Sequence, residues 1–567
     1  MYKFVKLESK KTFYLLQFVS LVVLINGIYL LFLSLSLIHS HHGSKGSYFG
    51  VEVYPILGLT LVYLSVLLNK RKRTAWIFAL ISYYIYLAIA LRQLIASLTH
   101  HQQHLPSRLP YHLYLNIFLP IVIVWILFII RKIFVVRSDI SSFGFSLRVA
   151  TITLSATLTF GTVGYVIMDN ADFHQEISFG GAIHQTIDQF DLTVNKPYVP
   201  YTKRAKIFSD TLSVISTLAV VYCVYSLFLP IKLRYFDAHA KRREELAILK
   251  LGHGESEDFF KVWPRDKTYF FNENRTACIA YSVHRGIALA LGDPSGPVKE
   301  FSKIVADFCD YCYLNDWSPS FIHTEPHYNS IYKNSDLELQ NIGQEAVIDC
   351  KHFIEKVSAN KYFRNIKNRF EKQDFKVDLL SPPHDPETLK KLKNISDEWL
   401  SLPGKTERGF VMGYFNNAYL NMCDILVLKD KTGAITAFIN KIPNFKTSTA
   451  SYDMVRNSKQ SPGNSIDYLI YNFILYASKI GFLKVNMGLS PLANINASDS
   501  DKSMIDRLLS FAYTKGDKFY SFEGLNKFKD KYEPKWSTRY IAYKGGSSGF
   551  LRTLRALNVA TKKIKHH

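Results

Sequence analysis

The chain is 567 residues long and carries 69 Lys and Arg against 47 Asp and Glu, which gives a net charge of +22, and it contains 6 cysteines. One hydrophobic core rarely serves a chain of this length, and so few cysteines exclude a disulfide-stapled scaffold. The excess of positive charge favours partners that are rich in phosphate, such as RNA or anionic lipids.

Residues 1–230 are predicted to form a membrane domain of about six helices, because six apolar stretches are long enough, or nearly so, to cross a bilayer of about 30 Å. Clusters of Lys and Arg flank the stretches on one side, which is typical of the cytoplasmic side of a membrane. An even number of spans then predicts a cytoplasmic N-terminus and a cytoplasmic region after Pro230, with the protein in the cell membrane. The stretches are 13–38, 54–68, 75–98, 113–130, 147–168 and 207–229.

Residues 231–567 alternate short β-rich runs with amphipathic helices, which predicts mixed α/β structure. We predict a linker over 231–265, two subdomains over 266–385 and 386–545, and a basic tail over 546–567. In the first subdomain the expected elements are a hairpin from 276–283 and 286–291, a helix over 300–315, strands over 321–323 and 345–349, and a basic helix over 360–372. In the second they are a helix over 386–400, a hairpin from 425–428 and 435–439, a strand over 449–455, a helix over 465–480 and a strand over 484–487.

Short catalytic motifs are mostly missing from the sequence. There is no Walker loop, no H-E-x-x-H and no dinucleotide glycine fingerprint, so any group transfer would need a substrate that arrives activated. The stretch GGSSG at 545–549 follows the last predicted strand and indicates a flexible tail rather than a nucleophile turn. Cys309 and Cys312 form a C-x-x-C on a predicted helix, and the surrounding apolar spacing favours a structural helix face over a metal or redox site.

Several blocks of the sequence, in order, resemble the multiple peptide resistance factor family, the aminoacyl-phosphatidylglycerol synthases. Each block is weak alone, and their order carries the resemblance. The blocks are GTVGYVIMD (161–169), SEDFFKVWP (256–264), LGDPSGP (291–297), ISDEWL (395–400), ERGF (407–410), YDMVR (452–456), NMGLSPLAN (486–494) and GLNKFKDKYEPKW (524–536), with Arg539 and Tyr540 following.

The resemblance implies a multi-pass α-helical membrane domain followed by a cytosolic α/β (α+β) domain of two tandem acetyltransferase-like (GNAT) folds. It implies transfer of lysine, with alanine as the alternative, from aminoacyl-tRNA to phosphatidylglycerol, and a less anionic or cationic lipid that resists cationic antimicrobial peptides. The partners would be aminoacyl-tRNA and phosphatidylglycerol, with a homo-oligomer left open. Full-length family members carry further spans that act as a flippase, so a short form with six spans puts flipping by this chain in doubt.

The chemistry of such a transfer is ester exchange, which needs no cofactor, metal or ATP, because the donor ester is already activated. The protein must position the reactants, remove a proton and stabilise an oxyanion. Asp453 and Arg456 lie three residues apart at the end of a predicted strand, and match the D-x-x-R of the family. We expect them to be catalytic, and the competing interpretation is a plain salt bridge.

Further residues are expected to bind substrate. Lys527, Lys529 and Lys531 alternate, so an extended segment would direct all three toward phosphates, whereas a helix would split them between faces. The other candidates are Glu407 for the cationic group of the amino acid, Arg408 beside it, Asn486 with the free backbone N–H groups of the turn that follows, and Arg539. Surface ion pairs, a folding turn and a solvated charge run are the structural alternatives.

Two basic helices, over 364–372 and 551–565, suit either anionic lipid headgroups or the RNA backbone. Two other functions remain open from the sequence. One is a Fem-type transfer of the amino acid to a cell-wall precursor, and the other is a flippase or transporter with a regulatory cytosolic domain.

Overall fold

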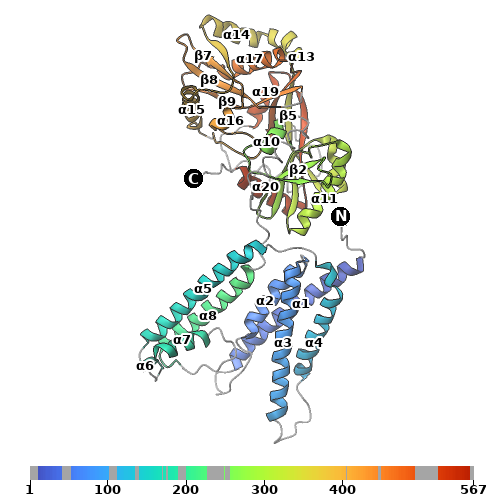
Figure 1. Ribbon diagram of the computed structural model, residues 1–567, viewed down its shortest axis with the longest axis vertical. Coiled ribbons are helices and arrows are strands. Elements are labelled where there is room, and N and C mark those ends of the chain that lie inside the picture. The colour runs from blue at the N-terminus through green and yellow to red at the C-terminus, as the bar shows by residue number, and fades with distance from the viewer. Residues whose placement is uncertain are drawn as a thin grey trace. The chain divides into compact units, whose positions relative to one another are not determined.

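The computed structural model describes residues 10–40, 53–69, 71–100, 111–134, 140–168, 170–173, 177–188, 200–226, 248, 256–403, 405–444, 448–491 and 522–561. The chain divides into two compact units, and the division falls between Lys232 and Leu233. The N-terminal unit is helical, and the C-terminal unit is built on one large sheet (Figure 1).

Each of the six predicted apolar stretches is helical in the N-terminal unit. By length and composition, two segments qualify as candidate membrane spans, Tyr14–Phe32 and Arg73–Leu91. The described parts of three other helices are apolar but shorter, so a crossing by all six stretches remains a prediction. The helices are α1 (Lys10–Ser40), α2 (Val53–Asn69), α3 (Arg73–His100), α4 (Tyr111–Ile129), η2 (Arg131–Ile133), α5 (Ile140–Ile167), α6 (Asn170–Phe173), α7 (Phe179–Asp188) and α8 (Lys203–Ser226).

Small residues and polar contacts hold α1 against its neighbours. A Cβ atom added to Gly27 would lie 2.8 Å from the carbonyl oxygen of Gly58, so the two glycines allow α1 and α2 to approach closely. The buried Asn26 amide donates a hydrogen bond of 3.3 Å to the hydroxyl of Tyr83 on α3. Within this unit the packing therefore depends on close backbone contact and on a polar contact between buried side chains.

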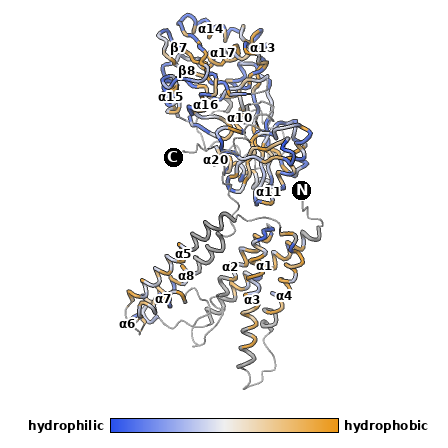
Figure 2. Tube along the Cα trace, viewed as in Figure 1, coloured by the Kyte–Doolittle hydropathy of each residue, from blue (hydrophilic) through white to orange (hydrophobic). Residues whose placement is uncertain are grey.

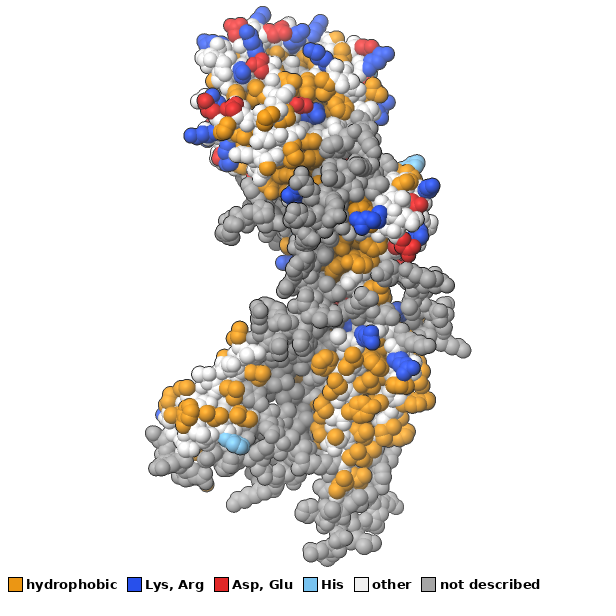
Figure 3. Space-filling model, in the orientation of Figure 1, with side chains coloured by type: hydrophobic (Ala, Val, Ile, Leu, Met, Phe, Trp, Pro, Cys, Tyr) orange, Lys and Arg blue, Asp and Glu red, His pale blue; other side chains and the backbone are white. Residues whose placement is uncertain are grey.

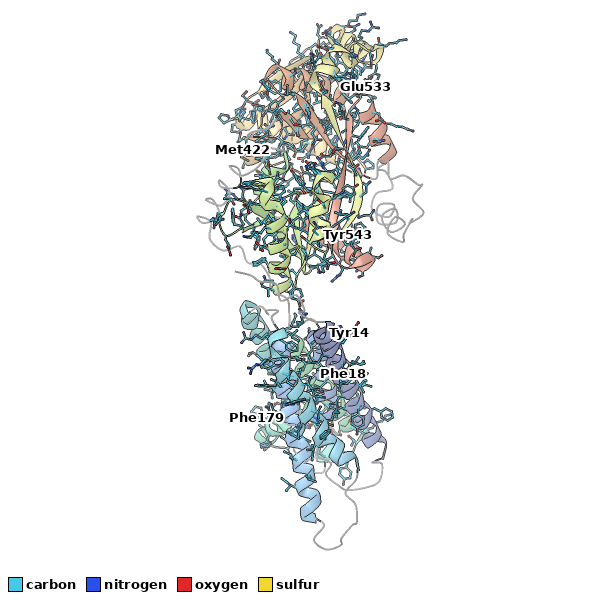
Figure 4. All side chains as sticks on the ribbon, turned by 90° about the vertical axis from the view of Figure 1, so that its right-hand side faces the viewer. Tyr14, Phe18, Phe179, Met422, Glu533 and Tyr543 are labelled. Atoms are coloured by element: carbon cyan, nitrogen blue, oxygen red, sulfur yellow. The ribbon has the colours of Figure 1, made fainter. Side chains whose placement is uncertain are left out.

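The outer surface of the helical unit is strongly apolar. The helices are hydrophobic along most of their length in Figure 2, and Figure 3 shows hydrophobic side chains over the face formed by α1 to α4. Tyr14, Phe18 and Phe179, which are labelled in Figure 4, are 67%, 57% and 67% exposed. A surface of this kind is unusual on a water-soluble protein and typical of contact with lipid.

The C-terminal unit contains one eleven-stranded sheet in the order β1-β2-β3-β4-β11-β5-β10-β9-β8-β7-β6. The parallel neighbours are β3 with β4 and β9 with β10, and the other pairings are antiparallel. The strands are β1 (Thr268–Phe271), β2 (Cys278–His284), β3 (Ile287–Leu291), β4 (Ser318–Thr324), β5 (Glu338–Asp349), β6 (Lys376–Leu380), β7 (Ile425–Lys429), β8 (Ile435–Lys441), β9 (Thr449–Asn457), β10 (Lys484–Pro491) and β11 (Lys535–Tyr543).

Helices cover both faces of this sheet. One face of β5 and β7–β10 packs against α13, α14 and α17, and a second apolar cluster joins α10, α15, α16 and α20 to the opposite face. The helices are α10 (Ser256–Val262), α11 (Phe301–Leu314), α12 (Asn329–Asn334), α13 (Cys350–Glu355), α14 (Lys361–Lys372), α15 (Pro386–Leu400), α16 (Asn417–Leu420), α17 (Ser465–Lys479), α19 (Phe522–Asp530) and α20 (Gly546–Thr561), with short turns η3 (Val298–Glu300), η4 (Pro326–Tyr328) and η5 (Val357–Ala359).

The two halves of the sheet exchange strands. β11 comes from the C-terminal end of the chain but pairs with β4 and β5, and β6 precedes residue 385 but pairs with β7. Strand pairing therefore crosses the boundary that we predict at residue 385.

Two sequence predictions at the edges of this unit are wrong. The end of the predicted linker forms α10, and its Phe259 ring lies 5.6 Å from the ring of Tyr419 in the core. The stretch GGSSG begins helix α20 instead of a flexible tail, because Phe550 and Ala556 have apolar positions to fill against β2 and β3. Residues 562–567 of the predicted tail lie outside the described residues.

Candidate active site

The parallel strands β9 and β10 pair over only part of their length. The paired residues are Thr449 with Lys484, Ala450 with Val485, and Ser451 with Asn486. Beyond that point β9 continues to Asn457 and β10 to Pro491 without further pairing between them. The two strands therefore diverge inside the sheet and leave backbone groups unpaired at its centre, a place where a ligand is able to reach the main chain.

A β-bulge in β9 brings Asp453 and Arg456 to one face of the sheet. In a regular strand residues three apart point to opposite faces. Here Ile439 pairs with Val455 and Lys441 with Tyr452, so β9 has one residue more than β8 over this stretch. The extra residue reverses the alternation, and bulges of this kind are frequent beside active sites.

Asp453 is held by neutral donors. The backbone N–H of Gly413 donates to its Oδ2 atom at 2.8 Å, and the Tyr419 hydroxyl donates to Oδ1 at 2.9 Å. Position 413 requires glycine, since an added Cβ atom would lie 2.1 Å from Asp453 Oδ2. Burial raises the pKa of Asp453, and hydrogen bonds from Asn440, Tyr419 and Gly413 offset this only in part.

Four carboxylates of the second predicted subdomain, 386–545, could receive a cationic amino acid, and Asp453 differs from the other three in having no ion-pair partner in the described part of the chain. Within the described residues no Lys or Arg lies within ion-pair distance of Asp453. The other three are paired, namely Asp424 with Lys441 at 3.6 Å, Asp467 with Lys531 at 2.5 Å, and Glu407 with Arg456 at 3.0 Å. Asp453 is thus the carboxylate of this group that is available to accept a proton or an ammonium group.

Arg456 is buried and fully engaged. Its Nη2 atom donates to Glu407 Oε1 at 3.0 Å, its Nη1 atom donates to the Ser396 hydroxyl, and its guanidinium lies 5.2 Å from the centre of the Trp399 ring. Glu407 also accepts a hydrogen bond of 2.8 Å from the backbone N–H of Phe415. The structure therefore joins Glu407 to Arg456, where the sequence predicted a contact with the substrate, and Arg408 is exposed beside them.

A second polar cluster, on β4, β5, β10 and β11, surrounds Glu345. Arg539 donates to Glu345 at 2.6 Å, Asn486 donates to it at 3.2 Å, and His323 Nε2 lies 3.1 Å away. Burial raises the pKa of Glu345, but the charges of His323 and Arg539 outweigh it and bring the pKa below the ordinary value. Glu345 is therefore a carboxylate kept ionised by its neighbours.

Asn486 makes two hydrogen bonds within the protein. Its Oδ1 atom accepts from the backbone N–H of Gly488 at 2.8 Å, while its amide group donates to Glu345. The predicted turn after Met487 is instead a bulge within β10, which continues to Pro491, and Gly488 adopts a φ of 78° there. The N–H of Gly488 donates to Asn486, so the bulge does not offer this group to an oxyanion.

The alternating lysines are not extended. Lys527 and Lys529 lie on helix α19, and Lys531 follows its last residue, so of the two alternatives left open by the sequence the structure has the helix, which separates the lysines. Lys527 is exposed, whereas Lys529 is buried and donates to the carbonyl oxygens of Gly488 at 2.7 Å and Leu489 at 3.1 Å. Burial lowers the pKa of Lys529 to about 8, although the nearby Glu345 opposes the change.

A cavity of about 300 Å³ lies beside the paired stretch of β9 and β10, just before the strands diverge, and Thr449, Lys484 and Asn486 line it. Its lining contains two of the predicted residues, Asn486 and Arg539. Ser451 is 5% exposed, and among the described residues no partner reaches its hydroxyl. The full lining is Glu325, Val347, Asp349, Thr449, Lys484, Asn486, Lys535, Trp536, Ser537 and Arg539.

Several residues of this region could not be found from the sequence. His323, Glu345 and Tyr419 come from distant segments, and no motif surrounds them. Only the backbone conformation marks one of them as unusual, because His323 has a φ of 74°, which is uncommon outside glycine. The sequence does not show this conformation.

The structure also bears on metal binding. Across the described ranges no three His, Cys, Asp or Glu side chains gather in a way that would hold a metal ion. Cys312 is buried on α11, and burial raises the pKa of both Cys312 and Cys309, the latter to about 12. Both cysteines lie on helix α11, as the sequence predicts, and Cys312 is part of its buried face.

The fold and the site define a class, a mixed α/β domain on one large sheet with a partly buried carboxylate beside diverging strands. A family model described as "Phosphatidylglycerol lysyltransferase, C-terminal" matches residues 246–543. The chain belongs to the phosphatidylglycerol lysyltransferase family, which confirms the resemblance to the multiple peptide resistance factor proteins.

Curated relatives and solved structures agree with this assignment. A phosphatidylglycerol lysyltransferase of Bacillus subtilis is 30% identical over 50% of this chain and 33% of its own length, and one of Staphylococcus epidermidis is 27% identical over 53% of this chain and 36% of its own length. The matched region thus spans about a third of these relatives.

The structure of L-PGS from Bacillus licheniformis has 27% identity and a TM-score of 0.51, and covers 58% of this chain and 98% of that chain. The C-terminal domain of a lysylphosphatidylglycerol synthetase of Agrobacterium fabrum, at 24% identity and a TM-score of 0.50, covers 58% of this chain and 99% of that chain and supports the fold.

Proposed function

We propose that this chain transfers an aminoacyl group, lysine in the first instance, from aminoacyl-tRNA to a glycerol hydroxyl of phosphatidylglycerol. The C-terminal unit would perform the transfer in the cytoplasm, and the N-terminal unit would lie in the cell membrane with several spans. Support for the membrane part comes from two helices of sufficient length and from the exposed apolar side chains of this unit.

The proposed step is an exchange of one ester for another. The lipid hydroxyl attacks the ester carbonyl of the aminoacyl-tRNA and gives its proton to the Asp453 carboxylate. The tetrahedral intermediate then collapses, its bond to the ribose oxygen breaks, and the proton passes from Asp453 to that oxygen. The donor ester supplies the driving force, so no ATP, metal or redox cofactor is needed.

The observation that carries this proposal is the environment of Asp453. A general base works best when its pKa approaches the working pH, and burial shifts the pKa of Asp453 upward. Its neighbours donate hydrogen bonds from a backbone N–H and a hydroxyl, so the carboxylate is oriented without being neutralised by a cation. Ser451 is the last residue of β9 that pairs with β10. Asp453 lies two positions further along β9, about 7 Å from Ser451 along the strand.

Other residues have supporting roles in the proposal. Arg456 fixes Glu407 and the segment that carries Gly413, and thereby orients the loop that donates to Asp453. Asn486 and Arg539 line the cavity and are assigned to phosphate or ester oxygens of the substrates. In the cell, lysylation would convert an anionic lipid to a cationic one and reduce binding of cationic antimicrobial peptides.

The test is a reconstituted transfer reaction. The purified chain in vesicles containing phosphatidylglycerol is incubated with tRNA charged with radioactive lysine or, in parallel, alanine, and the extracted lipids are identified by mass spectrometry. The expected product is lysyl-phosphatidylglycerol, formed with charged tRNA and not with free lysine and ATP. If alanyl-phosphatidylglycerol is formed instead, the amino acid in the proposal is alanine and not lysine. If no aminoacyl lipid is formed, the proposal is overturned.

Two comparisons complete the test. A cell-wall precursor offered in place of phosphatidylglycerol should remain unmodified, because the acceptor is proposed to be a bilayer lipid. Cells that express the chain should survive higher concentrations of a cationic peptide than cells that express the Asp453→Asn variant.

A further inference from the structure

Helix α14 is amphipathic, and its apolar face is used within the protein. Phe363, Ile366 and Phe370 are 1%, 5% and 0% exposed. The Phe370 ring stacks on Tyr468 of α17 with the ring centres 4.6 Å apart and an angle of 12°. These contacts fix which side of α14 faces outward.

The outward side of α14 is strongly basic. Residues 351–376 contain eight Lys and Arg against three Asp and Glu. Lys361, Arg364, Lys367 and Lys372 are all exposed on the helix itself. In Figure 3 Lys and Arg side chains stand out, together with acidic ones, at the end of the unit where Figure 1 places α14.

Part of this charge is not neutralised by the protein. Glu355 pairs with Lys351 at 4.0 Å and Glu371 with Lys367 at 3.9 Å. In the part of the chain that the structure describes, no carboxylate lies within ion-pair distance of Lys361, Arg364 or Lys372. Such a cluster repels itself and is stabilised by an external polyanion.

Helix α14 is joined to the cavity of the candidate active site through α13 and the end of β5. The backbone N–H of His352, on α13, donates a hydrogen bond of 3.0 Å to the side chain of Asp349. Asp349 lines the cavity together with Lys484, its partner on β10, and Lys535. The neighbouring residues Ile348 and Val485 pack on the side of α14, so a polyanion on α14 would reach the cavity around the shared end of β5 and β10.

The chemistry of α14 favours RNA over a membrane. A helix that binds a bilayer surface inserts its apolar face, but α14 buries that face against α17. Its exposed aromatic side chain, Tyr362, has its hydroxyl bonded to Asn464 and Lys531. Exposed apolar side chains occur instead near Gly413, on the opposite side of the sheet, where Met412 is 42% and Met422, labelled in Figure 4, is 44% exposed.

We propose that the exposed face of α14, formed by Lys361, Arg364, Lys367 and Lys372, binds the phosphate backbone of the RNA that carries the amino acid. The proposal rests on the proposed function for the identity of that RNA. The charged stretch of α14 is about 16 Å long at 1.5 Å per residue, enough to reach several phosphates of one strand. Binding through phosphates depends on charge and not on base sequence, so different tRNA bodies should bind alike.

The experiment measures binding of uncharged total tRNA to the full chain in detergent, by filter binding at several salt concentrations. The Lys361→Glu/Arg364→Glu variant should bind at least about tenfold more weakly, and the slope of log affinity against log salt should fall by about 2, one unit for each lost phosphate contact. The control is Lys390→Glu/Lys391→Glu, which makes the same charge change on the exposed side of α15. This control should bind tRNA as the unmutated chain does.

The tRNA-binding experiment has separate results for each way in which the proposal could fail. Unchanged tRNA binding by the α14 variant, or an equal loss in the α15 control, would overturn the proposal. Loss of binding to phosphatidylglycerol vesicles with tRNA binding retained would identify α14 as a membrane surface instead. The Lys361→Gln/Arg364→Gln variant controls for folding. It should also bind tRNA more weakly, and a thermal unfolding midpoint equal to that of the parent would show that the protein is still folded.

The transfer assay tests the proposed function separately from tRNA binding. In the transfer assay the α14 variant should raise the KM for charged tRNA and leave kcat nearly unchanged, because α14 lies away from Asp453. If the unmutated chain makes no aminoacyl lipid, the proposed function fails, while the tRNA-binding comparison still decides whether α14 binds RNA.

Discussion

Two carboxylates on the same large sheet, Glu345 and Asp453, have opposite surroundings. Glu345 is contacted by Arg539 and His323, and its pKa is lowered. Asp453 is contacted by a backbone N–H and a hydroxyl, and its pKa is raised. The comparison teaches that burial alone does not define a catalytic acid, because the charge of the neighbours decides whether the group holds other residues in place or exchanges protons.

The largest effect is expected for Asp453→Asn, which keeps the shape of the side chain and removes its basicity. Loss of a general base costs about 10²–10⁴ in rate, so aminoacyl lipid formation should fall by that factor. In the unmutated chain the acid limb of the pH–rate profile should lie above the ordinary range of an Asp. Asp374→Asn, at an exposed turn, is the control and should keep full activity. Equal activity of the two variants would remove Asp453 from the mechanism.

Arg456→Ala is the next largest change, because it leaves Glu407 buried without its cation. Breaking a buried ion pair from one side costs about 3–5 kcal/mol, so the free energy of unfolding should fall by that amount. Denaturant unfolding of the purified chain, followed by tryptophan fluorescence, measures this. In the Glu407→Gln/Arg456→Ala double variant part of the stability should return. If the double variant instead loses the sum of the two single effects, the pair is not coupled.

A smaller effect is expected for Gly413→Ala. The new methyl group would lie 2.1 Å from Asp453 Oδ2 and 2.5 Å from the Tyr419 ring, so the carboxylate must move. A displacement of about 1 Å reduces the rate by about 10²-fold or less, and kcat should fall while the fold remains. Gly463→Ala is matched to it, since a methyl group there meets nothing within 4 Å. A normal rate for Gly413→Ala would show that Asp453 tolerates displacement.

The smallest effect is expected for Glu345→Gln, which tests whether the charge of Glu345 stabilises the fold. The folded-state pKa of Glu345 lies below its unfolded value of about 4.5, so its charge stabilises the fold at neutral pH. This stabilisation, about 1.5–3 kcal/mol for hydrogen bonds to a charged group, begins to be lost below the unfolded value and is gone once the pH has fallen through the folded-state pKa of about 2. The difference in unfolding free energy between parent and variant should shrink between pH 7 and pH 3. A constant difference would mean that the Glu345 charge contributes nothing.

The sequence was sufficient for the long helices of both units and for most strands, because their apolar periodicity is regular, whereas the short helices α10, α12, α13 and α16 were not predicted. Helix α15 begins and ends where the spacing predicts, and α14 begins one residue later than predicted. The failures have physical causes. The sequence left open whether the segment of Lys527, Lys529 and Lys531 is helical or extended. Lys529 is buried on α19 because its ammonium group donates to two carbonyl oxygens of β10, which no local pattern records.

The candidate site was only partly predictable. Asp453 and Arg456 were identified, but the bulge that brings them to one face depends on the register against β8, which no local pattern records. Glu345 and Arg539 are 194 positions apart in the chain and meet because β11 enters between β4 and β5. Contacts of this kind are set by topology and not by the neighbouring sequence.

The position of β11 also has a consequence for biosynthesis. A ribosome that has made both flanking strands, β4 and β5, has yet to make nearly 200 residues before the strand that separates them emerges. The N-terminal half of the sheet therefore cannot be completed while the chain is growing, and a truncated product would expose two strand edges at its centre. Premature termination should accordingly give insoluble protein rather than a partly active fragment.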